Sequence, residues 1–298
     1  MGWRSSTSAI VVALAAAFAT AGEVQAAEHM TYPDWQGAWA RWVPPNAVRD
    51  PGNGGTGFTA GGQPSFDQTK PWGRGQEAPL TPEYQKIFEE SIADQAAGGQ
   101  GRDWPARCMP FGLPRIMTVI FPMEIVITPN TTHIMFDYAM PRRIYTDGRS
   151  FPKDYEEPNF YGLSIGKWVD EDGDGKYDVL EIETRNFRSP RSYEASGLPL
   201  HDDGESVVNE RLFIDKADKD ILHDVITVTD HALTRPWTVD KRYKREHNPI
   251  WYQLNCSEDN RHVYLGNEHY VISADDKLMP SKKDQAPPDL SYFKTPKK

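Results

Sequence analysis

The sequence predicts a mostly β protein, an antiparallel barrel preceded by a loop-rich extension that carries one helix. From Ile116 to Cys256, apolar and polar residues alternate with a period of two in about ten short runs, and turn residues separate these runs. No helical crossover intervenes, so neighbouring runs are expected to pair as antiparallel strands. A continuous antiparallel sheet of that many strands tends to close on itself, which makes a barrel the expected architecture.

The amino-acid composition limits the classes of function that we expect. Of the 298 residues, 38% are hydrophobic and 11% aromatic, which is enough for a buried core. Lys and Arg number 33 against 43 Asp and Glu, so the formal net charge is −10. Nucleic acid is not an expected partner, because phosphate binding requires clustered cations. The sequence predicts no serine-hydrolase elbow, no phosphate-binding loop and no dinucleotide-binding turn after a strand. We therefore expect no organic cofactor.

Residues 1–26 are predicted to be a secretory signal. Arg4 provides the positive start, the run Ala9–Ala21 is apolar but too short to span a bilayer, and Val24 and Ala26 are small residues suited to a cleavage site. An uncleaved anchor helix is the alternative. No later segment is long and apolar enough to span a membrane. We therefore expect a periplasmic or secreted protein that is not embedded in the membrane.

The two cysteines, Cys108 and Cys256, are predicted to form a disulfide because an oxidising compartment favours their pairing. Such a bond closes a loop of about 150 residues and contributes about 4–5 kcal/mol in the chain-entropy model. The alternative is a free nucleophilic thiol at Cys108, but no activating base stands near it in the sequence.

One helix is predicted near 82–96. Thr81 suits the N-cap, Pro82 the first helical position, apolar residues follow at helical spacing, and glycines at 98–99 end the run. So short a helix needs a surface to lie on, so we expect it to brace or cover the barrel. The expected organisation is a signal at 1–26, an extension at 27–107, a barrel domain at 108–275 and a flexible tail at 276–298.

Several motifs give the chain a resemblance to a known group of proteins. They are Cys108, Pro110, Gly112, Pro114 and Arg115, then RRIYTDGR (142–149), GLSIGKW (162–168), NER (209–211), TRPW (234–237), and a late cysteine followed by Glu258 and Asn260. Over roughly residues 105–262 the sequence resembles a large group of exported bacterial proteins. The resemblance implies a lipocalin-like (calycin) barrel and no particular reaction. Gly37-Ala38-Trp39 is similar to the glycine-x-tryptophan that opens a lipocalin barrel.

The acidic run DEDGDGKYDVLE (170–181) is typical of a calcium loop. Alternating carboxylates on a tight turn converge on one hard cation, and a glycine permits the backbone reversal. The flanking segments read as strands, so we expect a structural calcium in a hairpin rather than an EF-hand. An acidic, solvated hairpin turn is the alternative. The expected ligands are Asp170, Asp172, Asp174, Lys176 through its carbonyl, Asp178 and Glu181.

The segment RRIYTDGR contains the first candidate catalytic residues. On a strand, Arg143, Tyr145 and Asp147 share one face, which then holds a cation, a phenol and a carboxylate. If this face lines the barrel interior, it suits acid/base chemistry. The alternative is an arginine–carboxylate network that plugs one end of the barrel, with Glu210 and Arg211 as partners. The candidate substrate-binding residues are Arg149, Trp168, Glu210 and Arg211.

Histidine supplies the other candidate acid or base. His201 beside Asp202 and His231 beside Asp230 lie in polar loops, where a general base is often found, although surface histidines are the simpler interpretation. His201 completes the candidate catalytic set. No histidine shows the sequence spacing of a zinc site, so no transition-metal centre is expected.

These features predict an exported barrel that binds a small, partly apolar organic molecule and performs cofactor-independent acid/base chemistry of the lyase, isomerase or hydrolase type. The alternative is a non-catalytic carrier of a hydrophobic or aromatic ligand, and a third possibility is a purely structural role. Titratable groups with perturbed pKa values inside the barrel favour catalysis. An apolar lumen favours a carrier, and a filled barrel favours a structural role.

Overall fold

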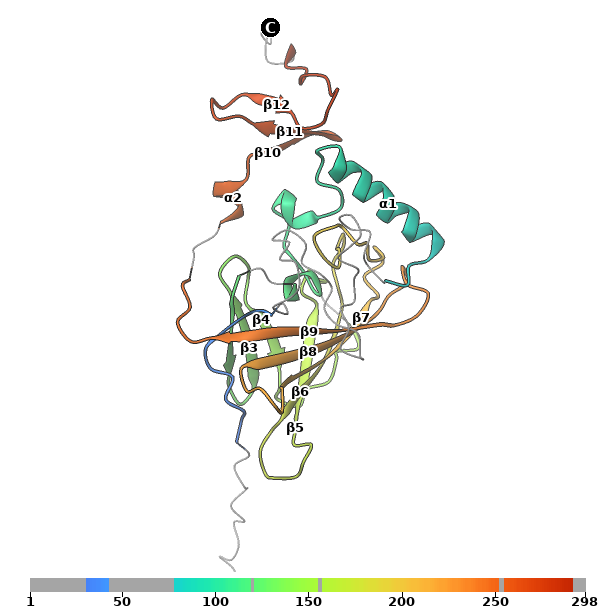
Figure 1. Ribbon diagram of the computed structural model, residues 1–298. Coiled ribbons are helices and arrows are strands. Elements are labelled where there is room, and N and C mark those ends of the chain that lie inside the picture. The colour runs from blue at the N-terminus through green and yellow to red at the C-terminus, as the bar shows by residue number, and fades with distance from the viewer. Residues whose placement is uncertain (1–30, 43–77, 119–120, 155–156, 252–254, 292–298) are drawn as a thin grey trace, which may run out of the picture.

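A computed structural model describes residues 31–42, 78–118, 121–154, 157–251 and 255–291. Its main body is a closed barrel, which confirms the predicted mostly β fold (Figure 1). The predicted signal at 1–26 lies outside the described residues. The nine strands of the barrel are β1 (Ala38–Arg41), β2 (Met123–Ile127), β3 (Thr131–Phe136), β4 (Arg142–Tyr145), β5 (Leu163–Val169), β6 (Val179–Arg185), β7 (Val207–Ile214), β8 (Ile221–Thr229) and β9 (Trp237–Glu246).

Strand β1 closes the barrel, although it comes from the segment expected to be loops. It pairs antiparallel with both β2 and β9, with Trp39 opposite Met123 on one side and Arg245 on the other. Trp39 is fully buried, and the guanidinium of Arg245 lies 4.4 Å from the centre of its ring. The Gly37-Ala38-Trp39 triplet therefore stands where the closing strand begins.

The order of strands around the barrel follows the chain, but the pairing is not antiparallel throughout. Strands β4 and β5 run parallel, with Tyr145 opposite Ile165. The expectation of uniform antiparallel pairing is wrong at this point, because the long connection over 146–162 returns the chain to the end of the barrel where β4 began. The other neighbouring strands pair antiparallel, as predicted.

The predicted alternation produces the core. On each strand every second side chain faces the interior; Ile134, Ile144, Leu180, Leu212 and Ile226 are each fully buried there. Burying these side chains is the main favourable contribution to folding, at about 1.5–3 kcal/mol for each.

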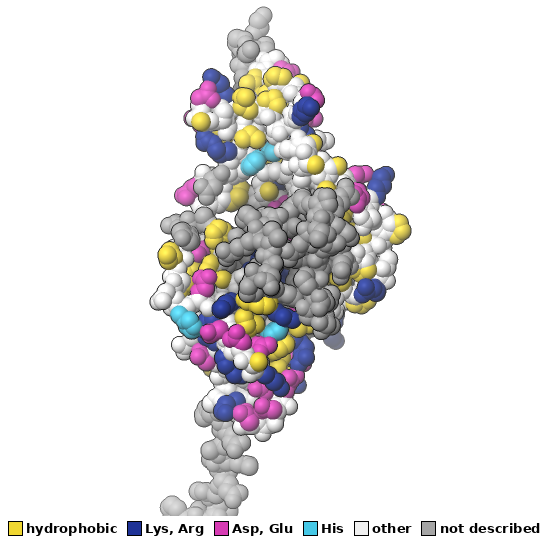
Figure 2. Space-filling model, in the orientation of Figure 1, with side chains coloured by type: hydrophobic (Ala, Val, Ile, Leu, Met, Phe, Trp, Pro, Cys, Tyr) yellow, Lys and Arg dark blue, Asp and Glu magenta, His cyan; other side chains and the backbone are white. Residues whose placement is uncertain are grey.

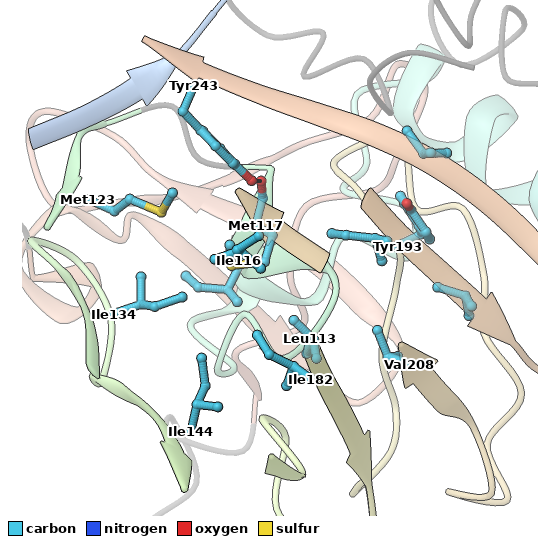
Figure 3. Close-up of a cluster of buried hydrophobic side chains, with 14 of the residues drawn as sticks. Leu113, Ile116, Met117, Met123, Ile134, Ile144, Ile182, Tyr193, Val208 and Tyr243 are labelled. Carbon is cyan, nitrogen blue, oxygen red and sulfur yellow. Dashed lines mark hydrogen bonds between the residues drawn. The ribbon is translucent and has the colours of Figure 1, made fainter. Parts of the chain in front are cut away.

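A short segment that belongs to none of the nine strands lies inside the barrel. The run from Ile116 is predicted to be a strand, but the structure has a 3₁₀ helix, η2 (Arg115–Met117), at this position. Its apolar side chains and Leu113 are fully buried and lie among the inward-facing side chains of the strands (Figure 3). The hydroxyl of Tyr243 on β9 donates to the Met117 carbonyl at 2.7 Å. This part of the interior is therefore occupied by the chain itself.

The predicted helix is α1 (Pro82–Ala96), and Thr81 and Pro82 occupy the N-cap and the first helical position, as the sequence predicts. Thr81 accepts a hydrogen bond from the Tyr84 backbone amide at 3.3 Å, and Pro82 begins the helix. Phe88 and Ile92 are buried, and Ser91 donates to the Ser196 carbonyl at 3.2 Å. The helix thus braces the long β6–β7 connection. Among the described residues, no helix combines the length and apolar character that crossing a bilayer requires.

The carboxyl-terminal part differs from the expected boundaries. The barrel ends at Glu246, and the chain then forms α2 (Cys256–Asp259) and a separate sheet of β10 (His262–Leu265), β11 (Glu268–Ile272) and β12 (Leu278–Pro280). Figure 1 places this sheet near the end of α1, where Lys282 forms an ion pair with Asp94. Part of the expected flexible tail is therefore a paired strand.

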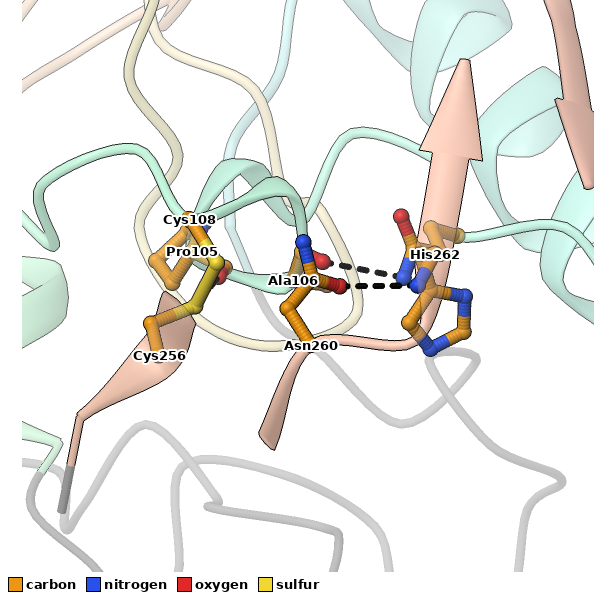
Figure 4. Close-up of a disulfide and its surroundings, with 7 residues drawn as sticks. Pro105, Ala106, Cys108, Cys256, Asn260 and His262 are labelled. Atoms are coloured by element: carbon orange, nitrogen blue, oxygen red, sulfur yellow. Dashed lines mark hydrogen bonds between the residues drawn. A yellow bond between two sulfur atoms is a disulfide. The ribbon is translucent and has the colours of Figure 1, made fainter. Parts of the chain in front are cut away.

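The predicted disulfide is confirmed. Cys108, which follows the 3₁₀ helix η1 (Trp104–Arg107), is bonded to Cys256 at the start of α2 (Figure 4). The bond joins residues 148 positions apart and ties the segment that leads to the second sheet to the region between α1 and the barrel. Since both cysteines are bonded, neither is a free nucleophile.

Candidate functional site

Charged side chains lie inside the barrel, on the same strand faces as the apolar core. They are Arg142 on β4, Glu210 on β7, Asp224 on β8 and Lys241 on β9, with exposed fractions of 1%, 2%, 0% and 4%. Burying a charge away from water costs free energy unless it is paired and hydrogen-bonded. The partners of each group therefore decide what the interior can do.

Arg142 and Glu210 form a satisfied pair. The Nη1 atom of Arg142 donates to Oε1 of Glu210 at 2.8 Å, and Nη2 donates to Oε2 of the same carboxylate. Nη2 also contacts the hydroxyls of Ser164 at 3.2 Å and Thr184 at 3.1 Å. Burial alone would lower the pKa of Arg142, but the charge and hydrogen bonds of Glu210 outweigh it and raise the pKa. The structure therefore contains an arginine–carboxylate network of the kind that the sequence analysis gives as the alternative, and its arginine is Arg142.

Asp224 and Lys241 are a different kind of pair. They stand directly opposite each other on β8 and β9, and both face inward. Neither carboxylate oxygen of Asp224 has a hydrogen-bond partner among the described residues. Burial, together with the nearby Glu210 charge, raises the pKa of Asp224 well above its ordinary value. Burial lowers the pKa of Lys241 to about 7, although the Asp224 charge opposes this shift.

Two tyrosines complete the interior site. Tyr193 comes from the long β6–β7 connection; its ring lies 4.8 Å from that of Trp237 and 5.2 Å from Nζ of Lys241. Its hydroxyl is buried and has no hydrogen-bond partner within the described part of the chain, whereas that of Tyr243 is bound to Met117. Burial raises the pKa of both phenols, and the Asp224 charge raises it further. Both rings are labelled in Figure 3.

The interior site can therefore exchange protons. At neutral pH Lys241 is divided between its charged and neutral forms, Tyr193 keeps its proton, and Asp224 binds a proton far more readily than an exposed aspartate. A native structure leaves few buried polar atoms unsatisfied, and such atoms mark places where water or a guest molecule supplies the missing bonds.

The face of β4 that was predicted to be catalytic points away from this site. Arg143 and Asp147 are exposed and Tyr145 is half-buried. Asp147 is bound by Arg149, whose Nε lies 2.9 Å from Oδ1, and the guanidinium of Arg149 lies 3.8 Å from the centre of the Tyr145 ring. The hydrogen bond from Arg149 lowers the pKa of Asp147. The structure thus does not bring these residues together with His201.

Ser164 belongs to a Gly-x-Ser-x-Gly pattern at 162–166, which invites comparison with a hydrolase elbow. The pattern runs along β5 instead of forming a strand-to-helix turn. Ser164 lies 2.8 Å from the Thr184 hydroxyl and is bound by Arg142. It is therefore part of the buried network and not an exposed nucleophile.

The four candidate substrate-binding residues line one groove, of about 860 Å³, over β5, β6 and β7. Arg149 and Arg211 are exposed there, and Arg211 forms ion pairs with Glu171 and Glu181. The side chains of Trp168 and Glu210 are buried, with Glu210 held by Arg142. Figure 2 shows basic and acidic side chains intermixed over the visible lower part of the barrel.

In the acidic loop between β5 and β6, three of the predicted ligands converge. Asp170, Asp172 and Asp178 each place an oxygen within 4.8 Å of the others. Asp174 instead pairs with Lys176 at 2.9 Å, and Glu181 pairs with Arg211 at 3.5 Å. Acidic side chains gather at the lower tip of the barrel in Figure 2, where Figure 1 draws this loop.

The two candidate histidines meet, but around a different carboxylate from those expected. Nδ1 of His201 lies 2.8 Å and Nδ1 of His231 lies 2.6 Å from the same oxygen, Oδ2 of Asp203. Asp230 binds the backbone amide of His201 at 2.9 Å, and Asp202 pairs with Arg102 at 3.6 Å.

Sequence reasoning missed the interior site. Asp224 stands among Leu222, Ile226 and Val228 at the apolar positions of its strand, and Lys241 stands likewise between Val239 and Tyr243. A charged residue at an inward position is a signal that the sequence does contain, because charged side chains are rarely buried and those with shifted pKa values gather at functional sites. Comparison with protein-family models, curated proteins and solved structures finds no match to this chain.

Proposed function

We propose that the protein binds a small, partly apolar organic molecule inside the barrel and performs cofactor-independent acid/base chemistry on it. Asp224, Lys241 and Tyr193 are the proposed acid/base groups. One observation carries the proposal: Asp224 is fully buried without a hydrogen-bond partner among the described residues, directly opposite a lysine whose pKa is about 7.

Burying Asp224 and Lys241 inside the barrel costs free energy. A buried charged pair whose carboxylate lacks hydrogen bonds, as that of Asp224 does within the described part of the chain, destabilises the fold relative to apolar residues of similar volume. Groups with strongly shifted pKa values in a protected site are typical of catalysis. A general base works best when its pKa lies near the operating pH, which Lys241 satisfies. Proton abstraction by Lys241 and donation by Tyr193 or protonated Asp224 suit a lyase or isomerase.

A guest molecule must also fit. Apolar core side chains surround the site together with the Arg142–Glu210 pair, so a partly apolar molecule with one carbonyl or hydroxyl group matches both the lining and the unsatisfied Asp224 and Tyr193 atoms. Leu113, Ile116 and Met117 occupy part of the interior, so binding requires that the η2 segment move aside.

A non-catalytic carrier is the second candidate. It is favoured by the predominantly apolar interior and by the Arg142–Glu210 pair, whose bonds are already satisfied within the protein. A carrier would bind the same class of molecule but leave it unchanged.

The deciding experiment starts from small molecules that co-purify with the protein, identified by mass spectrometry. The recovered compound is incubated with fresh protein, and its conversion is followed. We expect conversion that is lost in Asp224→Asn and Lys241→Met and retained in Asp147→Asn, the matched change on the outer face. Binding without conversion would favour the carrier. Failure to recover any compound would leave a structural role as the better explanation.

We also propose that the β5–β6 loop binds a structural calcium ion through Asp170, Asp172 and Asp178, with the Lys176 carbonyl as a further ligand. The converging carboxylates support this, since calcium prefers oxygen ligands. Export to the periplasm or the medium fits both the disulfide and the calcium concentrations outside cells. Amino-terminal sequencing of the secreted form tests the export proposal, which expects a start at Ala27.

A further inference from the structure

Two loops at one end of the barrel bring together two imidazoles and a carboxylate. His201 and Asp203 lie in the β6–β7 connection, and His231 lies in the β8–β9 turn. One nitrogen from each histidine and one oxygen of Asp203 all lie within 4.8 Å of one another. We propose that His201, Asp203 and His231 form a binding site for a divalent transition-metal ion of the zinc class.

The donor set selects the class of metal. Imidazole nitrogen with carboxylate oxygen suits zinc and its neighbours, whereas calcium and magnesium prefer oxygen alone. In a tetrahedral zinc site, bonds of about 2.0–2.1 Å place the ligand atoms about 3.3 Å apart. The observed separations of 2.8 and 2.6 Å from Asp203 to the histidines require only a small outward movement to reach that spacing.

The local hydrogen bonds orient the ligand atoms towards one another. The backbone amide of Asp203 donates to Nδ1 of His201 at 3.2 Å, so this nitrogen carries its lone pair and no proton, and a metal ion bound there would take the place of that hydrogen bond. The Glu205 amide binds Oδ1 of Asp203 at 2.9 Å, which leaves Oδ2 directed at the histidines.

Neighbouring side chains hold the site without closing it. The ring of Tyr84 lies 5.4 Å from that of His201, and Asp230 fixes the His201 backbone. The side chain of His231 is 63% exposed, so water has access to complete the coordination. Bound metal would tie together two loops that are 28 residues apart at Asp203 and His231.

The test uses the full chain without a polyhistidine tag, freed of metal by a chelator and titrated with zinc chloride by calorimetry. We expect one zinc per chain, with an affinity that falls about 100-fold in His231→Ala and in Asp203→Asn, since removing a ligand costs at least what removing a supporting contact does. His231 is largely exposed, so its variant is expected to fold. Cobalt bound in place of zinc should show tetrahedral absorption bands that His231→Ala lacks.

Two controls separate this site from the rest of the chain. His247→Ala removes another exposed histidine next to a carboxylate, Asp220, and should bind zinc as the wild type does. Asp172→Asn disrupts the acidic loop and should also leave zinc binding unchanged. The proposal is overturned if the wild type binds no zinc, if His231→Ala binds it as tightly as the wild type, or if Asp172→Asn abolishes it.

Discussion

Asp224 and Lys241 face each other across β8 and β9 inside the barrel, each at a position where the strand pattern calls for an apolar residue. The carboxylate has no hydrogen-bond partner among the described residues, and burial lowers the pKa of the amine to about 7. Burying the pair lowers the free energy of unfolding relative to apolar residues, so substitutions at these two positions can measure what the pair contributes to the fold and to function.

The first prediction concerns that cost. Replacing both members by apolar residues of similar size, Asp224→Leu with Lys241→Met, should raise the free energy of unfolding by about 1–4 kcal/mol, because no charge then has to leave water. Urea unfolding at neutral pH measures the change. A double variant less stable than the wild type would mean that the pair contributes net stability, which would weaken its assignment to function.

The second prediction concerns pH. The pKa of Lys241 is about 7 in the folded protein against 10.5 for the free side chain. Between these values the unfolded chain binds a proton that the folded chain does not. Lys241 therefore makes the free energy of unfolding rise with pH in this window, by up to about 1.4 kcal/mol per pH unit, and below it the lysine contributes its full burial cost.

Asp224 acts in the opposite sense, since a raised carboxyl pKa gives stability that is lost as pH rises through the folded value. The measurement therefore compares the wild type with Lys241→Met by urea unfolding at several pH values from about 7 to 10. Loss of the lysine charge raises the pKa of Asp224 further in the variant, which adds to the expected difference in the same direction. The wild type should gain stability relative to the variant across this range. Parallel curves for the two proteins would contradict the shifted pKa.

The third prediction uses adjacent arginines on opposite faces of β4. Arg142→Met removes the partner of a buried carboxylate, Glu210, and should destabilise the protein by about 3–5 kcal/mol. Arg143→Met alters an exposed side chain and should change stability by less than about 0.5 kcal/mol. Chemical denaturation of the two variants compares them directly. Similar losses would show that the face assignment of β4 is wrong.

The fourth prediction concerns the acidic loop. Calcium should raise the melting temperature of chelator-treated protein, because an ion that binds only the folded chain stabilises it by about 1.4 kcal/mol for each tenfold excess over the dissociation constant. Asp172→Asn should abolish the shift. Asp174→Asn should have less effect, since Asp174 is paired with Lys176. An unchanged melting temperature, with no metal found by elemental analysis, would remove the site.

Much of the architecture could be predicted from local sequence. The period-two alternation predicts strands, Thr81 and Pro82 predict the start of α1, and the two cysteines have only each other as partners. The carboxylates of the acidic loop are close in sequence, so a single turn is enough to bring Asp170 and Asp172 together. Each of these features depends on neighbours along the chain, and this is the kind of information that a single sequence contains.

The interior site depended on the tertiary structure. Alternation shows that Arg143, Tyr145 and Asp147 share a face, but not which face of β4 turns inward; packing against Ser164, Thr184 and Glu210 decided this in favour of Arg142. The strand that closes the barrel and the meeting of His201 with His231 likewise arise from contacts between distant segments. Such contacts are set by burial and charge pairing in three dimensions, and short-range patterns do not encode them.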